Sequence, residues 1–266
     1  MTQDYNHKPF FFIQMSDPQF GMLTANADFA GESVLFAKAV AQANRLNPAF
    51  IVLTGDLINV PANELQTSAA WGVWGRLKPT IKTWFLPGNH DIGDAPTPET
   101  LLWYRRRIGK DWYSFNQETW HFIALNSCII FNSSHAEQEM QNQWSWLQHD
   151  LQQSQARYAG RIMVFMHHSL FLQLPDEPDD QYFNIPLACR RQYLELFHRY
   201  HVAAVIAGHR HLNRQGTDGL LQMITTAPVG MPLGNDPSGF RIVRVYPDHF
   251  DHQYYGLDNV PEKIEL

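Results

Sequence analysis

This chain contains little cysteine, no long hydrophobic run and no excess of basic residues. Among its 266 residues only Cys128 and Cys189 are cysteines, and neither lies in a context that indicates a catalytic thiol. Such low cysteine usage is typical of a reducing cytoplasm, so we expect a cytoplasmic protein. No stretch approaches the ~20 apolar residues that cross a membrane. The N-terminus also lacks the basic segment and long apolar stretch of a secretory signal.

The charge balance is mildly acidic. The chain carries 20 basic and 26 acidic residues, which gives a formal net charge of −6 with neutral histidine. A surplus of negative charge argues against broad nucleic-acid binding, because such binding depends on contacts between basic side chains and phosphates. We therefore expect no nucleic-acid partner. The composition gives no indication of the oligomeric state.

Length and composition favour one large folded unit. The sequence is 44% hydrophobic and 13% aromatic, enough to bury a substantial core, and α/β proteins commonly reach this length as a single unit. No internal repeat or low-complexity tract divides it, and the two best linker candidates, residues 94–98 and 175–186, are short. We predict a single domain over residues 1–266, with its core at about 8–256.

Short apolar runs alternate with amphipathic segments along the chain. Five runs bounded by Gly, Pro or Asp predict buried strands at residues 10–15, 50–53, 81–86, 162–166 and 202–207. Apolar residues at three- and four-residue spacing predict helices at 29–46, 63–77, 98–108, 138–155 and 190–200. Further strands are expected at 113–115, 120–125, 220–226, 240–246 and 252–255. This order fits a layered α/β fold with two packed sheets and outer helices.

Each of the five apolar runs is followed at once by residues that can bind a metal ion. They are Asp17 and Gln19, Asp56, Asn89, His167, and the pair His209 and His211. Carboxylate, amide and imidazole groups are the ligand types that hold hard-to-borderline divalent cations. Open α/β sheets build their sites at the carboxyl ends of strands, so we expect these side chains to converge there. Two adjacent ions need roughly eight to twelve ligand positions, and these seven groups with shared oxygens and water would supply them.

The spacing within two of the motifs adds to this interpretation. Successive side chains of an extended backbone point to opposite faces. If the backbone stays extended past the strand end, the two imidazoles of His209 and His211 therefore reach one side. Asp17 and Gln19 have the same spacing and are expected to behave in the same way.

Each motif also has a structural explanation that needs no metal. A lone histidine after a strand is often a hydrogen-bonded structural residue, and Gly55-Asp56 alone could form a turn or a helix N-cap. Asn89 could serve as a residue that tolerates positive φ, and Gln19 as a turn residue after Pro18. These explanations would have to hold together at five strand ends, which favours the metal site.

In this order, Asp-x-Gln, Gly-Asp, Gly-Asn-His-Asp, a single His after a strand and Gly-His-x-His resemble the motifs of the calcineurin-like metallophosphoesterase superfamily. The resemblance spans residues 10 to about 245, and Gln19 departs from it because most members have His there. A closer likeness is to the calcineurin-like phosphoesterase domain-containing branch, called "complete" serine/threonine phosphatases. It is carried by residues 17–21, 55–58, 88–93 with 96–97, 179–184, 236–239, and 254–255 with 257–258.

The resemblance implies a four-layer α-β-β-α sandwich, with two mixed β-sheets flanked by helices. It also implies two divalent metal ions: Asp17 and His211 would bind the first, Asn89, His167 and His209 the second, and Asp56 would bridge them. His168 could replace His167, which is preferred because it follows the apolar run directly. Gln19 would bind the first ion itself or through water. Mn²⁺ is the expected ion, with Fe, Zn and Mg as alternatives.

The resemblance further implies a hydrolase in which a metal-bridging hydroxide attacks phosphorus. His90 would protonate the leaving group, and Asp91 would orient the His90 ring. The leading expectation is a phosphomonoesterase acting on a phosphorylated small molecule or protein, including phosphoserine or phosphothreonine. The alternatives are a phosphodiesterase acting on cyclic nucleotides or phospholipid-type diesters, and a non-catalytic scaffold of the same fold.

Residues 174–184 follow the strand that carries His167, so they are expected near the mouth of the site. The segment holds Asp176, Glu177, Asp179 and Asp180 before Tyr182 and Phe183. It is either a solvated acidic turn or a lid over the site. As an acidic rim it would repel highly anionic substrates.

Overall fold

The computed structural model describes residues 8–180 and 182–266. Within these residues, five strands form a first mixed sheet in the order β11-β10-β1-β2-β3. β1 runs parallel to β2 and β2 parallel to β3, while β10 and β11 are antiparallel to their neighbours. The strands are β1 (Phe10–Met15), β2 (Phe50–Thr54), β3 (Lys82–Leu86), β10 (Gly239–Val245) and β11 (Phe250–Gly256).

Six strands form a second mixed sheet in the order β4-β5-β6-β7-β9-β8. The four central strands are parallel, and the two edge strands pair antiparallel. The members are β4 (Tyr113–Gln117), β5 (Trp120–Ala124), β6 (Ile162–Phe165), β7 (Val202–Ala207), β8 (Arg214–Asp218) and β9 (Leu221–Thr225).

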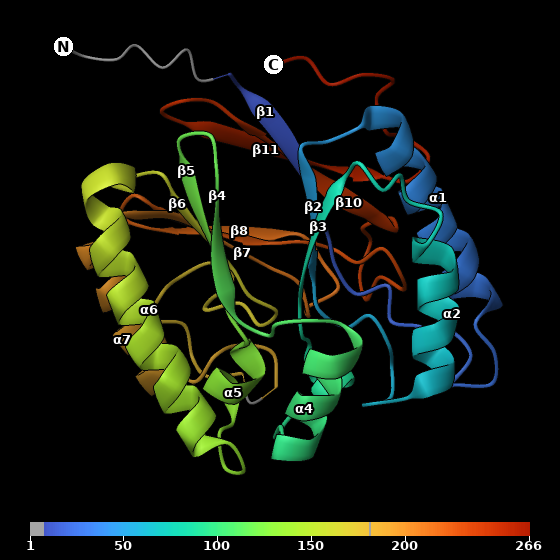
Figure 1. Ribbon diagram of the computed structural model, residues 1–266, viewed down its shortest axis with the longest axis horizontal. Helices are drawn as coiled ribbons and strands as arrows, with labels where there is room; N and C mark the ends of the chain where they lie inside the picture. Colours follow the sequence, from blue (N-terminus) through green and yellow to red (C-terminus); the bar gives the residue numbers. More distant parts are fainter. Residues whose placement is uncertain (1–7, 181) are drawn as a thin grey trace.

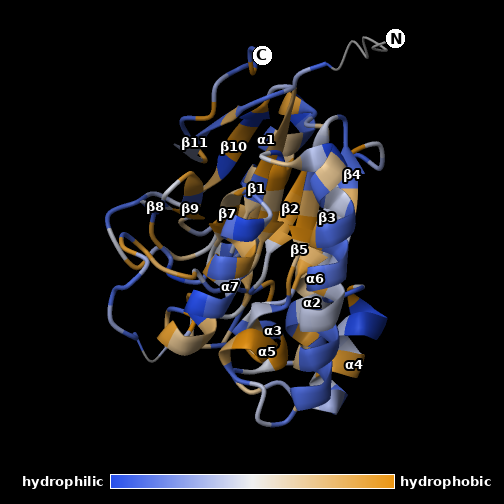
Figure 2. Ribbon diagram, turned by 90° about the vertical axis from the view of Figure 1, so that its left-hand side faces the viewer, coloured by the Kyte–Doolittle hydropathy of each residue, from blue (hydrophilic) through white to orange (hydrophobic). Residues whose placement is uncertain are grey.

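Helices cover the outer face of each sheet. α1 (Ala30–Leu46) and α2 (Glu64–Trp74) lie along the first sheet, and α6 (Glu137–Tyr158) and α7 (Leu187–Arg199) lie along the second (Figure 1). The layers are therefore helix, sheet, sheet and helix, and the predicted four-layer sandwich with two mixed sheets is confirmed. Hydrophobic residues concentrate in the strands, whereas the outer helices are largely hydrophilic (Figure 2).

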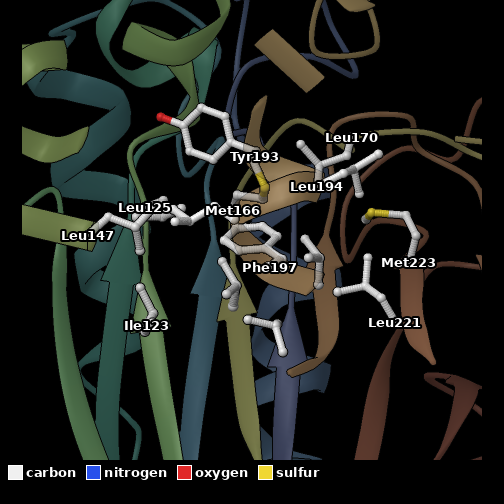
Figure 3. Close-up of a cluster of buried hydrophobic side chains, with 14 of the residues drawn as sticks. Ile123, Leu125, Leu147, Met166, Leu170, Tyr193, Leu194, Phe197, Leu221 and Met223 are labelled. Atoms are coloured by element: carbon white, nitrogen blue, oxygen red, sulfur yellow. The ribbon is translucent and has the colours of Figure 1, made fainter. Parts of the chain in front are cut away.

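Alternation along the strands produces three buried layers of side chains. In β1, Phe12 points between the sheets, where its ring stacks on Phe50 at 4.6 Å, while Ile13 and Met15 face α1 and α2. In β5, Phe122 likewise lies between the sheets, whereas alternate residues of the second sheet pack against α6 and α7 (Figure 3). Buried apolar area is the main stabilising contribution, so the period-two pattern fixes which face of each strand is covered.

Helix starts follow local capping chemistry. The side chain of Asn63 accepts the N–H groups of Leu65 and Gln66 at the start of α2. Thr97 caps α4 (Pro98–Arg107), whose first residue is a proline that has no N–H to satisfy. The predicted helices and strands lie within a few residues of the observed ones. For example, the helix predicted at 138–155 extends to Tyr158.

Three elements were not predicted. β8 is a polar edge strand, and α3 (Asn89–Ile92) and α5 (Ser127–Phe131) are single turns. Cys128 lies in α5 and is buried, as expected for a core residue. Gln181, part of the 179–184 motif, lies outside the described residues. No helix among the described residues has both the length and the apolar character needed to cross a membrane.

The topology determines where the polar motifs meet. β1, β2 and β3 are parallel neighbours in one sheet, and β6 and β7 are parallel neighbours in the other. Their carboxyl ends lie at the same end of the sandwich, where α4 and α5 are also found (Figure 1). The loops after these five strands therefore form one surface.

Candidate metal centre

Two buried groups of acidic and histidine side chains lie at this end of the sandwich. Ligand atoms of Asp56, His167 and His209 lie within 4.8 Å of one another, and so do those of Asp17, Asp56 and His211. Each of these five residues is at most 3% exposed. Asp56 belongs to both groups, so the two groups are adjacent and share a carboxylate.

A backbone carbonyl orients each of the three imidazoles. Nδ1 of His167 lies 2.8 Å from the Thr54 oxygen, Nε2 of His209 lies 3.0 Å from the Tyr182 oxygen, and Nδ1 of His211 lies 2.6 Å from the Met231 oxygen. A carbonyl only accepts, so that ring nitrogen carries the hydrogen. The other nitrogen of each ring is left for a metal ion, which it binds in its deprotonated form.

The two carboxylates have different surroundings. Asp17 accepts the backbone N–H of His209 at 3.1 and 3.2 Å, and its Oδ1 lies 3.4 Å from His211 Nε2. Oδ1 of Asp56 accepts the backbone N–H of His90 at 2.9 Å. Oδ2 of Asp56 accepts no hydrogen bond, although His167 Nε2 lies 3.2 Å away.

Unpartnered oxygens test whether this site fits divalent cations. Oδ2 of Asp56 and Oε1 of Gln19 are buried without a hydrogen-bond partner. A buried oxygen without a partner costs free energy, and a carboxylate costs most. Hard divalent cations bind such oxygens. With two carboxylates and three imidazoles around them, the residues present fit a pair of divalent cations.

Asn89 presents its amide oxygen to the cluster. Oδ1 lies 3.0 Å from His167 Nε2, while Nδ2 donates to Asp94 Oδ1 at 2.8 Å and to the Tyr182 hydroxyl at 3.0 Å. Two acceptors on the nitrogen fix which way the amide faces. Asn89 is the first residue of α3 and does not have positive φ, so it is not the positive-φ turn residue considered above.

The backbone is not extended at the site, and that expectation is wrong. φ is positive at Asp17 (50°), Gln19 (42°), Asp56 (53°), His209 (67°) and His211 (53°). Non-glycine residues rarely adopt this left-handed region, and such strain concentrates at functional sites. The alternating left-handed residues turn the chain back on itself, so His209 and His211 approach Asp17 from a loop that follows β7.

Two glycines permit close approach of the loops. A Cβ on Gly88 would lie 2.1 Å from Asp56 Oδ1, and a Cβ on Gly208 would lie 1.7 Å from Ser16 Oγ and 2.6 Å from Asp17 Oδ2. Neither position has room for a side chain. These contacts explain why glycine precedes Asn89 and His209 in the motifs.

The expected role of Asp91 is wrong. The Asp91 carboxylate accepts the backbone N–H groups of Asp56, Leu57, Ile58 and Gly88 at 2.8–3.2 Å and does not bond the His90 ring. The carboxyl group is buried because it joins the loop after β2 to the loop after β3. Burial, and then the charge of Asp56, raise the pKa of Asp91 to about 7, which the bonds from Gly88 and Ile58 oppose.

The carbonyl oxygen of Asn59 holds the His90 ring instead. It lies 2.8 Å from Nδ1, and the Tyr182 hydroxyl lies 3.3 Å from Nε2. Asn59 Oδ1 also accepts a hydrogen bond from Nε2 of Gln19 at 3.2 Å. This bond turns the free amide oxygen of Gln19 away from Asn59. Asn59 follows the Gly55–Ile58 motif directly, and its polar side chain there was the signal that could have identified it.

The His168 side chain is held by residues of α5. Its Nδ1 pairs with Ser127 Oγ at 2.9 Å, and its ring stacks on Phe131 at 4.9 Å. Burial, and then the neighbouring His209 and His167, keep the pKa of His168 well below its usual value. His168 belongs to neither acid–histidine group, whereas His167 belongs to the first.

Without cations, the pKa values of the neighbouring groups in the cluster are shifted in different directions. Burial lowers the pKa of His167, but the charges of Asp56 and Asp17 outweigh it and raise that pKa to about 9. Burial, and then His167, lower the pKa of His209 to about 4. Burial opposes ionisation of Asp56, but the charge of His167 overcomes it and holds the pKa of Asp56 below its usual value. The site therefore strongly favours positive charge beside Asp56.

The acidic loop is exposed at Asp176 and Asp179, but it is not a free acidic rim. Glu177 accepts the N–H groups of residues 172–174, Asp179 accepts the N–H of Leu187, and Asp180 pairs with Arg210 at 2.7 Å. Three of the four carboxylates thus hold the loop in place. Tyr182 of this loop contacts Asn89 and His90. The sequence did not predict these contacts, because the acidic residues were the prominent feature of the loop.

The layered fold and the paired acid–histidine groups define a metal-dependent phosphoesterase. Residues 12–213 match the family model of the calcineurin-like phosphoesterases. The chain belongs to the calcineurin-like phosphoesterase family, as the motifs predicted.

Known relatives agree with this assignment. The chain is 37% identical over 270 residues to the serine/threonine-protein phosphatase CPPED1 of Danio rerio, covering 96% of this chain and 87% of that protein. The Homo sapiens protein of the same name is also 37% identical over 270 residues, with 96% and 86% covered.

Solved structures share the fold. A dimetal phosphatase from Danio rerio superposes with a TM-score of 0.67 at 19% identity, covering 94% of this chain and 97% of its own. The purple acid phosphatase PPD1 of yellow lupin gives a TM-score of 0.70 at 12% identity, with 96% and 52% covered.

Proposed function

We propose that this protein hydrolyses phosphate monoesters with two bound divalent cations. Asp17, Gln19 and His211 would hold the first cation, Asn89, His167 and His209 the second, and Asp56 both. The observation that carries the proposal is Asp56, which belongs to both acid–histidine groups and whose Oδ2 is buried without a hydrogen-bond partner. When bound, the cations lower the pKa of water to near neutrality and neutralise charge on the phosphoryl oxygens.

The residues around the cations supply positioning and protons. The bond from Nδ1–H to Asn59 leaves Nε2 of His90 to give a proton to a leaving alkoxide. The backbone N–H of His90 is tied to Asp56 Oδ1, which fixes His90 relative to the shared carboxylate. His90 is therefore the proposed general acid, with Asn59 rather than Asp91 orienting its ring.

Replacing His90 by Ala should separate substrates by leaving group. General acid catalysis contributes roughly 10²–10⁴-fold, so hydrolysis of an alkyl phosphate should fall about 10²-fold. Hydrolysis of p-nitrophenyl phosphate should change little, because that leaving group needs no proton. Steady-state rates on both substrates, together with metal analysis of the variant, test this. An equal loss on both substrates would assign His90 another role.

The ligand set supports Mn²⁺ as the bound metal. Gln19 offers a neutral amide oxygen where most family members have an imidazole, and such an oxygen is a harder and weaker ligand. Fe, Zn and Mg remain the other ions to be compared, and metal analysis of protein purified without added metal identifies the native pair.

Changing Gln19 to His should tighten the first cation site. An imidazole nitrogen binds Mn²⁺ and Zn²⁺ more strongly than a neutral amide oxygen, so we expect about a tenfold lower Kd for one of the two Mn²⁺ ions. Titration calorimetry on metal-stripped protein measures it. Gln138→His is the matched control, because Gln138 is exposed on α6 and donates to Asn142. Equal Mn²⁺ affinity of wild type and Gln19→His would mean that Gln19 is not near the ion.

The substrate class follows from the relatives. Proteins 37% identical to this chain are named serine/threonine-protein phosphatases, which supports phosphoserine or phosphothreonine as the substrate. Three carboxylates of the acidic loop have hydrogen-bond or ion-pair partners, so the loop does not repel phosphopeptides strongly.

Turnover of matched esters tests the proposal. Metal-stripped protein is loaded with Mn²⁺ and given p-nitrophenyl phosphate, bis-p-nitrophenyl phosphate and a phosphothreonine peptide. We expect the monoester and the peptide to be hydrolysed faster than the diester. Preference for the diester would overturn monoester hydrolysis, and no turnover of any ester would overturn the function as a whole.

We also infer that residues 1–266 act as one domain in a reducing cytoplasm. The ring centres of Phe12 in the first sheet and Phe165 in the second lie 5.6 Å apart in the layer between the sheets, which supports one domain. Both cysteines are free thiols, which supports a reducing compartment. A single calorimetric unfolding transition and cell fractionation test the two statements separately.

A further inference from the structure

Tyr182 contacts three residues of the site at once. Its hydroxyl oxygen lies 3.0 Å from Nδ2 of Asn89 and 3.3 Å from Nε2 of His90. Its backbone carbonyl accepts Nε2–H of His209 at 3.0 Å. Tyr182 thus bonds residues that follow two different strands, β3 and β7, one in each sheet.

The direction of these hydrogen bonds can be assigned. The Asn89 amide nitrogen only donates, so the Tyr182 oxygen accepts from it. Nδ1–H of His90 is already given to the Asn59 carbonyl, which leaves Nε2 to face the Tyr182 hydroxyl. Nε2 accepts the hydroxyl hydrogen when the imidazole is neutral, and donates to the hydroxyl oxygen when it carries the proton for the leaving group, so the His90 ring is held at both of its nitrogens in either state.

The loop is built to hold Tyr182 in this place. Asp180 pairs with the Arg210 guanidinium at 2.7 Å, and that guanidinium also lies 3.9 Å from the centre of the Phe183 ring. Arg210 stands between His209 and His211, so the loop is clamped to the segment that carries both imidazoles. At the other end of the loop, the buried Arg190 donates to the carbonyls of residues 175, 177 and 185.

Tyr182 is more exposed to solvent than the residues of the two acid–histidine groups. Its side chain is 38% exposed, whereas the residues of the two acid–histidine groups are almost fully buried. A leaving-group oxygen that receives a proton from His90 Nε2 must come within hydrogen-bond distance of that nitrogen. It would then lie beside the Tyr182 hydroxyl.

We propose that Tyr182 is a positioning residue for His90, so that a docked 174–184 loop is needed to hydrolyse esters with unactivated alkyl leaving groups. This inference rests on the proposed role of His90. The hydroxyl fixes the imidazole with Nε2 toward the leaving group, and small displacements of a catalytic group are costly in rate. Serine- and threonine-type phosphates depend on that proton, whereas aryl phosphates do not.

Tyr182→Phe removes the hydroxyl and keeps the ring and the carbonyl that bonds His209. We expect kcat for an alkyl phosphate to fall about tenfold, with KM and the rate on p-nitrophenyl phosphate nearly unchanged. Tyr255→Phe is the matched control, because among the described residues its hydroxyl bonds only Gln253 on β11. Equal losses on alkyl and aryl esters, or no loss on either, would overturn the proposal.

A double mutant tests whether Tyr182 acts through His90. In the His90→Ala background, Tyr182→Phe should cause no further loss on the alkyl ester, because coupled residues are non-additive. A further tenfold loss there would mean that Tyr182 works independently of His90, which contradicts the proposal.

Nitrogen NMR of metal-stripped protein with labelled histidine gives a reading that does not depend on turnover. The Nε2 resonance absent from His90→Ala identifies His90. In Tyr182→Phe it should move toward the position of an imidazole nitrogen without a hydrogen bond, and in Tyr255→Phe it should stay. An unmoved resonance would overturn the contact. If the wild type hydrolyses no ester, the proposed function fails while this measurement still decides whether Tyr182 holds the His90 ring.

Discussion

Asp56→Asn should abolish turnover and leave the protein with one bound cation or none. The change removes the negative charge that both acid–histidine groups share, while the amide oxygen can still accept the His90 N–H. Without the cation pair, water near neutral pH is no longer activated, so the rate on p-nitrophenyl phosphate should fall on the order of 10⁴-fold or more. Rates and elemental analysis of the purified variant measure both effects.

The fold should survive this change, so a loss of activity can be attributed to the loss of bound cations. Asn has the shape of Asp, and Oδ2 of Asp56 has no hydrogen-bond donor to lose. Asp258→Asn is the matched control, because Asp258 is exposed and pairs only with Lys38 on the surface. Two cations bound to Asp56→Asn, or activity within tenfold of wild type, would contradict the shared carboxylate.

The sequence predicted those parts of the fold that depend on local pattern. The runs at 10–15 and 202–207 coincide with β1 and β7, because a fully buried strand is a continuous apolar segment. β8 escaped prediction because it reads Arg-Gln-Gly-Thr-Asp, with one buried residue among five. Pairing with β9 makes it a strand, and that pairing depends on tertiary structure rather than on its own residues.

The site was predictable in its residue types but not in its backbone. Acid, amide and imidazole groups after five strands sufficed to bring Asp17, Asp56 and the three histidines together. The left-handed φ values at these positions were not predicted, because Asp and His adopt positive φ more often than most residues but far less readily than glycine. Long-range partners such as the Tyr182 carbonyl on His209 also depend on loops that only the whole fold brings together.

Asp91 shows why a sequence motif does not reveal the role of each of its residues. It is adjacent to His90 in sequence, yet consecutive residues of a helical turn point in different directions. The His90 ring points toward Asn59 and Tyr182, whereas Asp91 turns inward to the loop after β2. The two side chains should therefore fail in different ways when they are replaced.

Asp91→Ala should destabilise the protein strongly. It would leave four buried backbone N–H groups, those of Asp56, Leu57, Ile58 and Gly88, without an acceptor. Each unsatisfied buried donor costs about 1–3 kcal/mol, so we expect a loss of at least about 4 kcal/mol in the free energy of unfolding. For a domain of this size that corresponds to a Tm lower by roughly 8–16 °C, which calorimetry on metal-stripped protein would detect.

His90→Ala is the natural comparison, because it should lose activity on alkyl esters with little change in Tm. Asp91→Asn keeps the volume of the side chain but turns an amide nitrogen toward backbone donors, so it should also lower Tm. If Asp91→Asn kept the wild-type Tm and reproduced the leaving-group dependence of His90→Ala, Asp91 would act through the His90 ring after all. The loss of stability without that dependence would instead assign Asp91 to the junction that holds Asp56 and His90 in register.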